Sequence, residues 1–397
     1  MENSGKLKKI CFSPAVFYLV PFLSLGSYLL SLIAGGTLHS VDGYYLIHYL
    51  YTYDHGFVAR GLVGEIISRF YDTVTPEVTK AVVIIFSISL LISASLCIGK
   101  ALTKVKDDRE RFLWVLTLVI VLCVMPVSFR TYFIDTKLDK MLWALTLFAV
   151  YLSDSKIGIW AAPVLCVIAT LINPVFLFCS MILIAIILLQ KFADSKFSAK
   201  NGVICGIAYI AMIAVGLYGS ISEKWLGFKT PDELIQYYFS RNAGGLPEEY
   251  ERFATEWLFD YFEPLKNVFR LAYEIYFVRW GNGVADIFNF VLIAIPAYAV
   301  LTVFWIKTIK KEENKFQKFI FFLCAVSPVI LILPIAISWE SSKYFSNNII
   351  VQLCLIIYYI VNKNQTVLAV LSEAKSFFKK HLILTAAGVL YLAMFLY

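Results

Sequence analysis

The sequence predicts an all-α polytopic membrane protein, on the evidence of its composition, its apolar runs and the spacing of its basic residues. Of its 397 residues, 60% are hydrophobic, and the mean hydropathy is +0.74. That is more apolar surface than a soluble domain can bury. The net charge of +7 comes from short Lys and Arg clusters between apolar runs. Such clusters indicate membrane topology and argue against a nucleic-acid partner.

Apolar runs follow one another along the whole chain and predict a single integral membrane domain, residues 1–397, with about eleven transmembrane helices. Each crossing needs about 20 residues for roughly 30 Å of hydrocarbon. The first run lacks a small-x-small cleavage pattern, so we expect it to remain as a helix. Asn173-Pro174 interrupts one long run, where the proline either kinks one helix or turns a hairpin. The predicted spans are 13–35, 81–99, 112–129, 141–153, 157–173, 174–190, 202–220, 286–306, 319–338, 349–361 and 382–397.

The basic clusters predict the orientation of these spans. If the N-terminus is cytoplasmic, every dense cluster falls on the cytoplasmic side, as the positive-inside rule requires. We therefore expect a protein of the bacterial inner membrane, with most of its acidic residues in external loops that include 36–80 and 221–285. The clusters are Lys6, Lys8 and Lys9; Lys104, Lys106, Arg109 and Arg111; Lys191, Lys196 and Lys200; Lys307, Lys310, Lys311, Lys315 and Lys318; and Lys375, Lys379 and Lys380.

The first external loop, 36–80, holds three of the four histidines and predicts two short amphipathic helices lying on the membrane. Asp54-His55-Gly56 is the predicted turn between them. In the second helix, Gly61 and Gly64 should bring another backbone close. The apolar positions are Leu46, Tyr49, Leu50 and Tyr53 in the first helix, and Val58, Leu62, Val63, Ile66, Ile67 and Phe70 in the second.

Asp42 comes just after the first span, where a carboxylate would face both water and lipid head groups. A sugar hydroxyl is a poor nucleophile, so a sugar transferase needs a nearby carboxylate or imidazole to take its proton. Asp42 is the candidate for this role, with Asp54, His39 or His55 as helper. The alternative is that Asp42 caps the helix that begins at Gly43.

Arg60 is the main candidate for binding a lipid phosphate, because a guanidinium can hold phosphate oxygens bidentately and stabilise charge on the leaving group. Its alternative role is to reach ordinary head groups or a nearby acid. Lys343, with Glu340, could read a sugar or phosphate at the outer end of a helix, or could form a local ion pair within an aromatic belt. Further phosphate contacts on the same predicted side are Arg130, Arg241, Arg270 and Arg279.

The second large loop, 221–285, is also helical in pattern, with amphipathic segments on either side of Pro264. Between Tyr237 and Pro247 the sequence predicts a flexible polar stretch with Arg241 at its centre. A loop of this kind could cap a cavity at the outer membrane face.

The sequence gives little indication of a metal or cofactor. Asp135 and Asp139 share a helix face and could hold Mg²⁺ or Mn²⁺ with substrate oxygens. Lys137 and Lys140 offer these acids local partners, which favours structural salt bridges instead.

The sequence also lacks the histidine pattern of a zinc site and the cysteine pattern of a disulfide framework. The three histidines of the first loop lack the spacing of a helical zinc site. None of the eight cysteines forms a C-x-x-C pair, which argues against a disulfide framework. We therefore expect no bound metal and no cofactor.

Residues 39–44, His-Ser-Val-Asp-Gly-Tyr, follow the first span, and the loop that they begin predicts two surface helices. In this layout the chain resembles the GT-C class of integral membrane glycosyltransferases. The resemblance implies a polyprenyl-phosphate-linked sugar donor, a glycan or glycolipid acceptor, and Asp42 as the catalytic acid/base. Gly43 stands where that class more often has a second acid.

In its size and its single large outer loop, the chain is also similar to bacterial O-antigen and capsule polymerases. Those enzymes join polyprenyl-diphosphate-linked repeat units. The expected function is glycosyl transfer from a lipid carrier in surface polysaccharide assembly, with repeat-unit polymerisation as the alternative. Other polysaccharide-assembly proteins would be its protein partners. A transporter or flippase for lipid-linked sugars is the rival from another class. A transporter should show charged residues inside its spans and two related halves. The sequence shows few such charges and no duplicated pattern.

Overall fold

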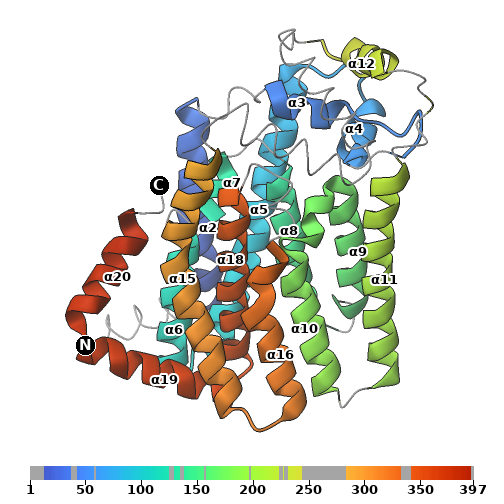
Figure 1. Cartoon of the computed structure of the whole chain (residues 1–397). Helices are drawn as coiled ribbons and strands as arrows, with labels where there is room; N and C mark the ends of the chain where they lie inside the picture. The colour runs from blue at the N-terminus through green and yellow to red at the C-terminus, as the bar shows by residue number, and fades with distance from the viewer. Residues whose placement is uncertain are drawn as a thin grey trace.

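The chain is a bundle of long helices with a cap of short helices at one end (Figure 1). The computed structural model describes residues 13–36, 43–57, 60–124, 129–134, 138–155, 158–195, 198–222, 227, 231–243, 283–331 and 341–394. The helices of the first half are α2 (Pro14–Ala34), α3 (Gly43–Leu50), α4 (Gly61–Ser68), α5 (Pro76–Val105), α6 (Arg109–Val124), α7 (Phe129–Ile134), α8 (Asp139–Leu152), α9 (Gly158–Ile172) and the 3-10 turn η1 (Pro174–Leu177). Those that follow are α10 (Met181–Asp194), α11 (Ala199–Ser222), α12 (Pro231–Ser240), α15 (Gly283–Lys311), α16 (Lys315–Val326), η4 (Ser327–Leu331), α18 (Ser341–Val361), α19 (Gln365–Lys380) and α20 (Leu382–Met394).

Each of the predicted spans overlaps a helix, although residues 332–338 of one span lie outside the described residues, so the all-α prediction is confirmed over the part of the chain that is described. Within that part of the chain, three helices are both long and apolar enough to cross a membrane: α2, α5 and the segment Tyr344–Val361 of α18. Shorter apolar helices cover Trp160–Ile172 and Gly202–Val215. The count of eleven spans therefore remains a prediction.

The run broken at Asn173-Pro174 is two helices and not one kinked helix. α9 ends at Ile172, and η1 separates it from the start of α10 at Met181. The Asn173 side chain accepts a 3.1 Å hydrogen bond from the backbone N–H of Val175 and so caps η1. Proline cannot supply the N–H that a continuous helix requires, so the chain turns here.

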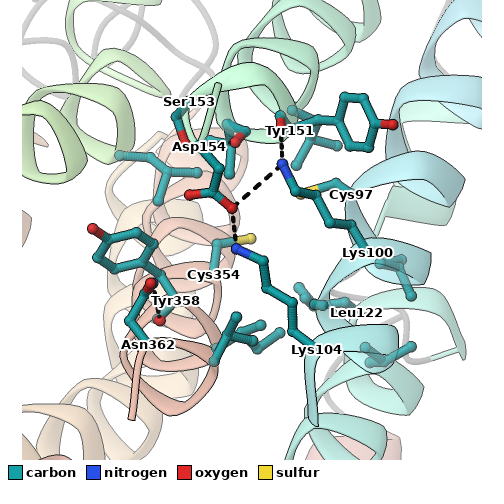
Figure 2. A pocket seen from close by; sticks show the side chains of 18 of the residues that line it. Cys97, Lys100, Lys104, Leu122, Tyr151, Ser153, Asp154, Cys354, Tyr358 and Asn362 are labelled. Atoms are coloured by element: carbon teal, nitrogen blue, oxygen red, sulfur yellow. Dashed lines mark hydrogen bonds and ion pairs between the residues drawn. The ribbon is translucent and has the colours of Figure 1, made fainter. Parts of the chain in front are cut away.

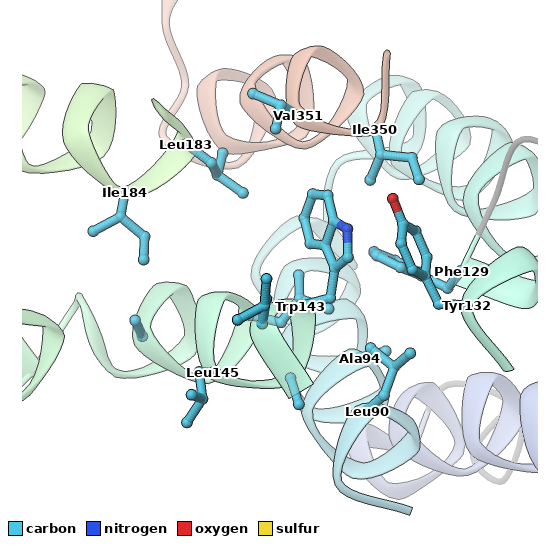
Figure 3. Packing of buried hydrophobic residues seen from close by; sticks show 14 of the residues in the cluster. Leu90, Ala94, Phe129, Tyr132, Trp143, Leu145, Leu183, Ile184, Ile350 and Val351 are labelled. Carbon is cyan, nitrogen blue, oxygen red and sulfur yellow. The ribbon is translucent and has the colours of Figure 1, made fainter. Parts of the chain in front are cut away.

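Long helices α2, α5 and α8 pack side by side, and Trp143 of α8 lies at the centre of the core (Figure 3). Trp143 is 1% exposed and meets the ring of Phe129 edge-on at 5.7 Å. In a membrane, close packing of this kind, and not water exclusion, holds helices together. The core thus fixes the bundle that carries the cap.

Basic clusters of the described helices gather at the end of the bundle opposite α3, α4 and α12 (Figure 1). There α19 lies across the bundle, and its Lys375 pairs with Glu110 of α6 at 3.0 Å. Glu373 of α19 pairs with Lys311 of α15. We call this the basic end, and the other the cap end. That the basic end faces the cytoplasm remains a prediction from the positive-inside rule.

Candidate functional site

At the cap end, α3 and α4 form the two short helices predicted for the first loop, with corrected limits. α3 ends at Leu50, so Tyr53 belongs to the turn that follows. Both helices are buried on one side by packing against each other, α9 and α12. The loop is therefore an integral part of the cap.

Two glycines of α4 lie in close contact, and the predicted close approach of another backbone is found at Gly64, while Gly61 faces a side-chain ring. A Cβ on Gly64 would lie 2.1 Å from the carbonyl oxygen of Tyr51 and 2.7 Å from that of Tyr49. At Gly61 it would lie 2.5 Å from the ring of Tyr53. Glycine is required at both positions because no side chain fits there.

Arg60 stands directly before α4 in the left-handed region, with φ 71°. Residues with a Cβ adopt this conformation at a cost and often do so at functional sites. The guanidinium donates from Nη1 to Nε2 of His48 at 2.8 Å, so that the imidazole accepts through this nitrogen. This contact joins the guanidinium to the last turn of α3.

Arg241 reaches the same end of α3 from the other large loop. Its Nη1 donates a 2.7 Å hydrogen bond to the carbonyl oxygen of Leu50, the last residue of α3. Cations at a helix carboxyl end interact favourably with the helix dipole. The backbone pairs as well: the N–H of Val74 donates to the Arg241 carbonyl at 2.7 Å, and the N–H of Ala243 donates to Val74 at 3.2 Å.

The sequence predicts a flexible polar stretch from Tyr237 to Pro247; residues 244–247 lie outside the described residues, but for residues 237–243 the prediction is wrong, as Arg241 shows. The residue is 8% exposed, and Tyr238, three residues earlier, is 1% exposed. Packing against α3 orders this segment. In the part of the chain that the structure describes, Nη2 of Arg241 is buried without a hydrogen-bond partner, which is costly for a charged group.

Asp54 lies in the turn after α3 and accepts two hydrogen bonds on Oδ2. The hydroxyl of Tyr237 donates at 2.7 Å and that of Thr52 at 2.9 Å. Hydrogen bonds from Tyr237 and then Thr52, aided by the charge of Arg241, hold the pKa of Asp54 below its ordinary value. The side chain is exposed and ionised at neutral pH.

His55 is also exposed, and its ring meets that of Tyr237 edge-on at 4.4 Å. Its carbonyl oxygen accepts a 3.0 Å hydrogen bond from the backbone N–H of Gly227. Tyr237 therefore contacts Asp54 and His55 together, and α12 closes over the turn between α3 and α4.

One comparison places this chain in a family. The sequence model of the family described as "Uncharacterised membrane protein Rv1490" matches residues 22–242, more than half of the chain. The chain belongs to that family. No curated protein matches the chain, and no solved structure does.

The segment matched to the Rv1490 family begins within α2 and ends one residue after Arg241. It contains the whole of α3, α4 and α12, and hence all of the contacts just described except the one made by Ala243. Membership in this family confirms that the chain is a membrane protein.

Of the predicted site residues, the structure brings Asp54, His55 and Arg241 together, while Arg60 contacts His48 in the last turn of α3. His39, Asp42, Arg270 and Arg279 lie outside the described residues. Lys343 lies in the first turn of α18, and its side chain is not among those described. Arg130 is on α7, where its guanidinium lies 3.9 Å from the centre of the Tyr28 ring.

Asp139 and Lys140 begin α8 and are 3% and 1% exposed. Asn173 donates to Oδ1 of Asp139 at 3.2 Å, and Lys140 donates to the hydroxyl of Ser87 at 3.0 Å. Asp135 and Lys137 lie outside the described residues, so the predicted salt bridges with them stay untested. Among the residues that the structure does describe, no three His, Cys, Asp or Glu side chains form a group that could hold a metal ion.

Sequence reasoning missed Tyr237, the residue that joins the two loops of this Rv1490-family cap. Thr52, the second donor to Asp54, was missed as well. The available signal was the Tyr237-Tyr238 pair just before Arg241. Aromatic rings are so frequent in this chain that the pair did not stand out.

Proposed function

We propose that this protein is a membrane glycosyltransferase that acts on polyprenyl-phosphate-linked sugars at the cap end of the bundle. The observation that carries the proposal is the convergence of two guanidiniums on one helix end. Arg60 contacts His48 in the last turn of α3, and Arg241 contacts the carbonyl oxygen of Leu50. Asp54 lies in the turn that follows.

Cations gathered in this way suit the phosphate that leaves when a lipid-linked sugar is transferred. A guanidinium carries several N–H donors in a planar fork, so Arg60 can contact His48 and phosphate oxygens at the same time. The buried Nη2 of Arg241 supplies a further donor. Both groups would stabilise negative charge as it develops on the leaving oxygen.

In the proposed inverting reaction, the acceptor hydroxyl attacks the anomeric carbon of the sugar while the bond from that carbon to the phosphate oxygen breaks. The electron pair of that bond leaves with the phosphate. Asp42 takes the hydroxyl proton, as the GT-C resemblance implies. Asp54 has a lowered pKa, which makes it a weak base, so its role is to accept a hydrogen bond from the sugar or the acceptor.

The proposed location is the outer face of the bacterial cytoplasmic membrane. The described basic clusters lie at the opposite end from α3 and α12. If the positive-inside rule holds for this chain, the cap end is external. Lipid-linked surface polysaccharide units are available to an enzyme on that face.

A transporter for lipid-linked sugars is the second candidate, and one observation favours it. Asp139 and Lys140 are buried inside the helical bundle, with polar partners on α5 and beside α9. Charged residues inside a membrane domain often mark a transport pathway. They also serve as interhelical contacts, so this observation does not displace the enzyme.

Deletion of the gene, followed by gel analysis of the surface polysaccharide, distinguishes the candidates. A uniform small mass change supports a sugar-adding transferase. Loss of the long-chain ladder with one repeat retained supports the polymerase alternative. Accumulation of lipid-linked repeats inside the cell supports the transporter and argues against the enzyme.

Point variants then test the proposed site. Asp42→Asn and Arg60→Ala should each reproduce the deletion while protein level stays normal. Arg69→Ala is the matched control, because Arg69 follows α4 as an exposed cation paired with Glu65 of the same helix. Normal polysaccharide from both site variants would remove these residues from the mechanism.

A further inference from the structure

A second polar feature lies at the basic end, far from the cap. There α5, α6, α8, α10 and α18 line a cavity of about 80 Å³ (Figure 2). Its wall is mostly apolar, with Leu122, Leu147 and Leu183 among the lining residues. Lys100, Lys104 and Asp154 also line it, at the side where α5 approaches its carboxyl end.

Three lysines from two helices converge on Asp154: Lys100 and Lys104 line the cavity, and Lys191 reaches the carboxylate from beside it. Lys100 Nζ lies 3.3 Å from Oδ2 of Asp154, and Lys191 Nζ of α10 lies 3.0 Å from Oδ1. Lys104, one helical turn after Lys100, also pairs with Oδ2. Figure 2 shows the ammonium groups of Lys100 and Lys104 on either side of this carboxylate.

The cluster carries excess positive charge. Three ammonium groups against one carboxylate leave a formal charge of 3 − 1 = +2. Burial acts to raise the pKa of Asp154, but hydrogen bonds from Lys104 and Lys191 outweigh it and keep that pKa well below the usual range. The carboxylate therefore stays ionised and holds the lysines near one another.

The side chains of the cluster are half-buried and not fully solvated. Lys100, Lys104 and Lys191 are 26%, 37% and 20% exposed. Their attraction for an anion is stronger beside an apolar wall than on an open surface, since the local dielectric is lower. Each ammonium has three N–H donors, so pairing with Asp154 does not use them all.

We propose that this cavity binds the phosphate group of an anionic ligand. Lysine binds phosphate as a compact point charge, and three lysines from separate helical positions can surround one phosphate. Basic pockets between helices at one side of a membrane bind anionic lipid head groups. The cavity lies at the basic end of the bundle. The phosphate that it binds can therefore belong to a lipid head group or to a soluble ligand.

The test measures binding by the purified full-length protein in detergent. Thermal unfolding is followed during titration with inorganic phosphate, with chloride at equal ionic strength as the reference. Separate samples receive vesicles of phosphatidylcholine with and without phosphatidic acid. Stabilisation by phosphatidic acid that free phosphate cannot match indicates a lipid head group, and stabilisation by inorganic phosphate alone indicates a soluble ligand.

Variants decide whether the effect arises in the cavity. Lys104→Gln and Lys191→Gln should each weaken binding of the effective probe about tenfold or more. Asp154→Asn should tighten it several-fold, because it removes the competing carboxylate. Lys310→Gln, an exposed lysine of α15 outside the cavity, is the matched control and should leave binding unchanged.

The lysine variants should weaken phosphate binding and Asp154→Asn should tighten it. A purely structural ion cluster would not produce these opposite effects. If the lysines only anchor Asp154, all three variants should lower stability and none should change the response to phosphate. That result would overturn the proposal. So would the lack of any response of the wild-type protein to both probes, or an equal loss of response in Lys310→Gln.

Discussion

Tyr237 donates a 2.7 Å hydrogen bond to Asp54, and this contact joins the two large loops of the cap. Asp54 follows α3 near the start of the chain, and Tyr237 lies in α12, which nine other described helical elements separate from α3. The same ring packs against His55. The position of α12 over the candidate site therefore depends on a contact between residues far apart in sequence.

Replacement of Tyr237 by Phe tests this contact through its pH dependence. The bond lowers the pKa of Asp54 from 3.8, so its contribution to stability is present above 3.8 and is lost as the pH falls through the lowered pKa. In Tyr237→Phe that pKa should return toward 3.8. We expect residues 231–240 of the variant to lose hydrogen-exchange protection at neutral pH.

Tyr71→Phe provides the control for that measurement, because Tyr71 is exposed in the same loop. Its protection pattern should match the wild type. Equal protection of α12 in Tyr237→Phe and wild type at all pH values would show that other contacts hold this helix.

Arg60→Gly separates the fold from the proposed chemistry. Glycine adopts the left-handed conformation of this position without strain, so α4 should form normally. The guanidinium is lost, and we expect transfer activity to fall about 10- to 100-fold, as for loss of a hydrogen bond to a charged group. Activity is measured with membranes from cells that express equal protein levels.

Arg60→Lys refines this result, because lysine retains the charge but not the two-pronged geometry of the guanidinium. It should recover part of the activity if the charge binds phosphate, and little if the bidentate geometry is required. Full activity of Arg60→Gly would exclude the side chain from catalysis.

Gly64→Ala should disrupt the packing of α4 on α3. The added Cβ would meet the backbone oxygens of Tyr51 and Tyr49, which cannot rotate away. Overpacking of this kind costs about 1–3 kcal/mol. The measurement is thermal unfolding in detergent.

For Gly64→Ala the matched control is Gly206→Ala in α11, where the new Cβ meets nothing within 4 Å. Alanine favours helix by up to about 1 kcal/mol over glycine, so this control should be unchanged or slightly more stable. A loss of stability as large as that of Gly64→Ala would contradict the steric explanation.

Ser87→Ala tests whether the buried lysine of α8 is a structural contact. The hydroxyl of Ser87 accepts a 3.0 Å hydrogen bond from Lys140, and its removal should cost about 1–3 kcal/mol in unfolding free energy. Ser89→Ala is the control, since that hydroxyl donates to Ile85 of its own helix. Unchanged stability together with lost sugar export would support the transporter.

Hydropathy and periodicity were sufficient to predict much of this protein. Apolar runs located the long helices. Apolar positions that recur every three or four residues located α3 and α4. Gly61 and Gly64 were also predicted to bring another backbone close, which the structure confirms at Gly64, while at Gly61 the close neighbour is the ring of Tyr53. These features are local, because they depend on residues within one or two helical turns of each other.

Only the tertiary structure decided which polar groups meet. Three sets of contacts join segments that are far apart in the sequence: Arg241 with Leu50, Tyr237 with Asp54, and the three lysines with Asp154. Hydropathy assigned Arg241 to a flexible loop because arginine and its neighbours are polar. Its true position follows from how α12 packs on α3, and no pattern along one stretch of sequence records such packing.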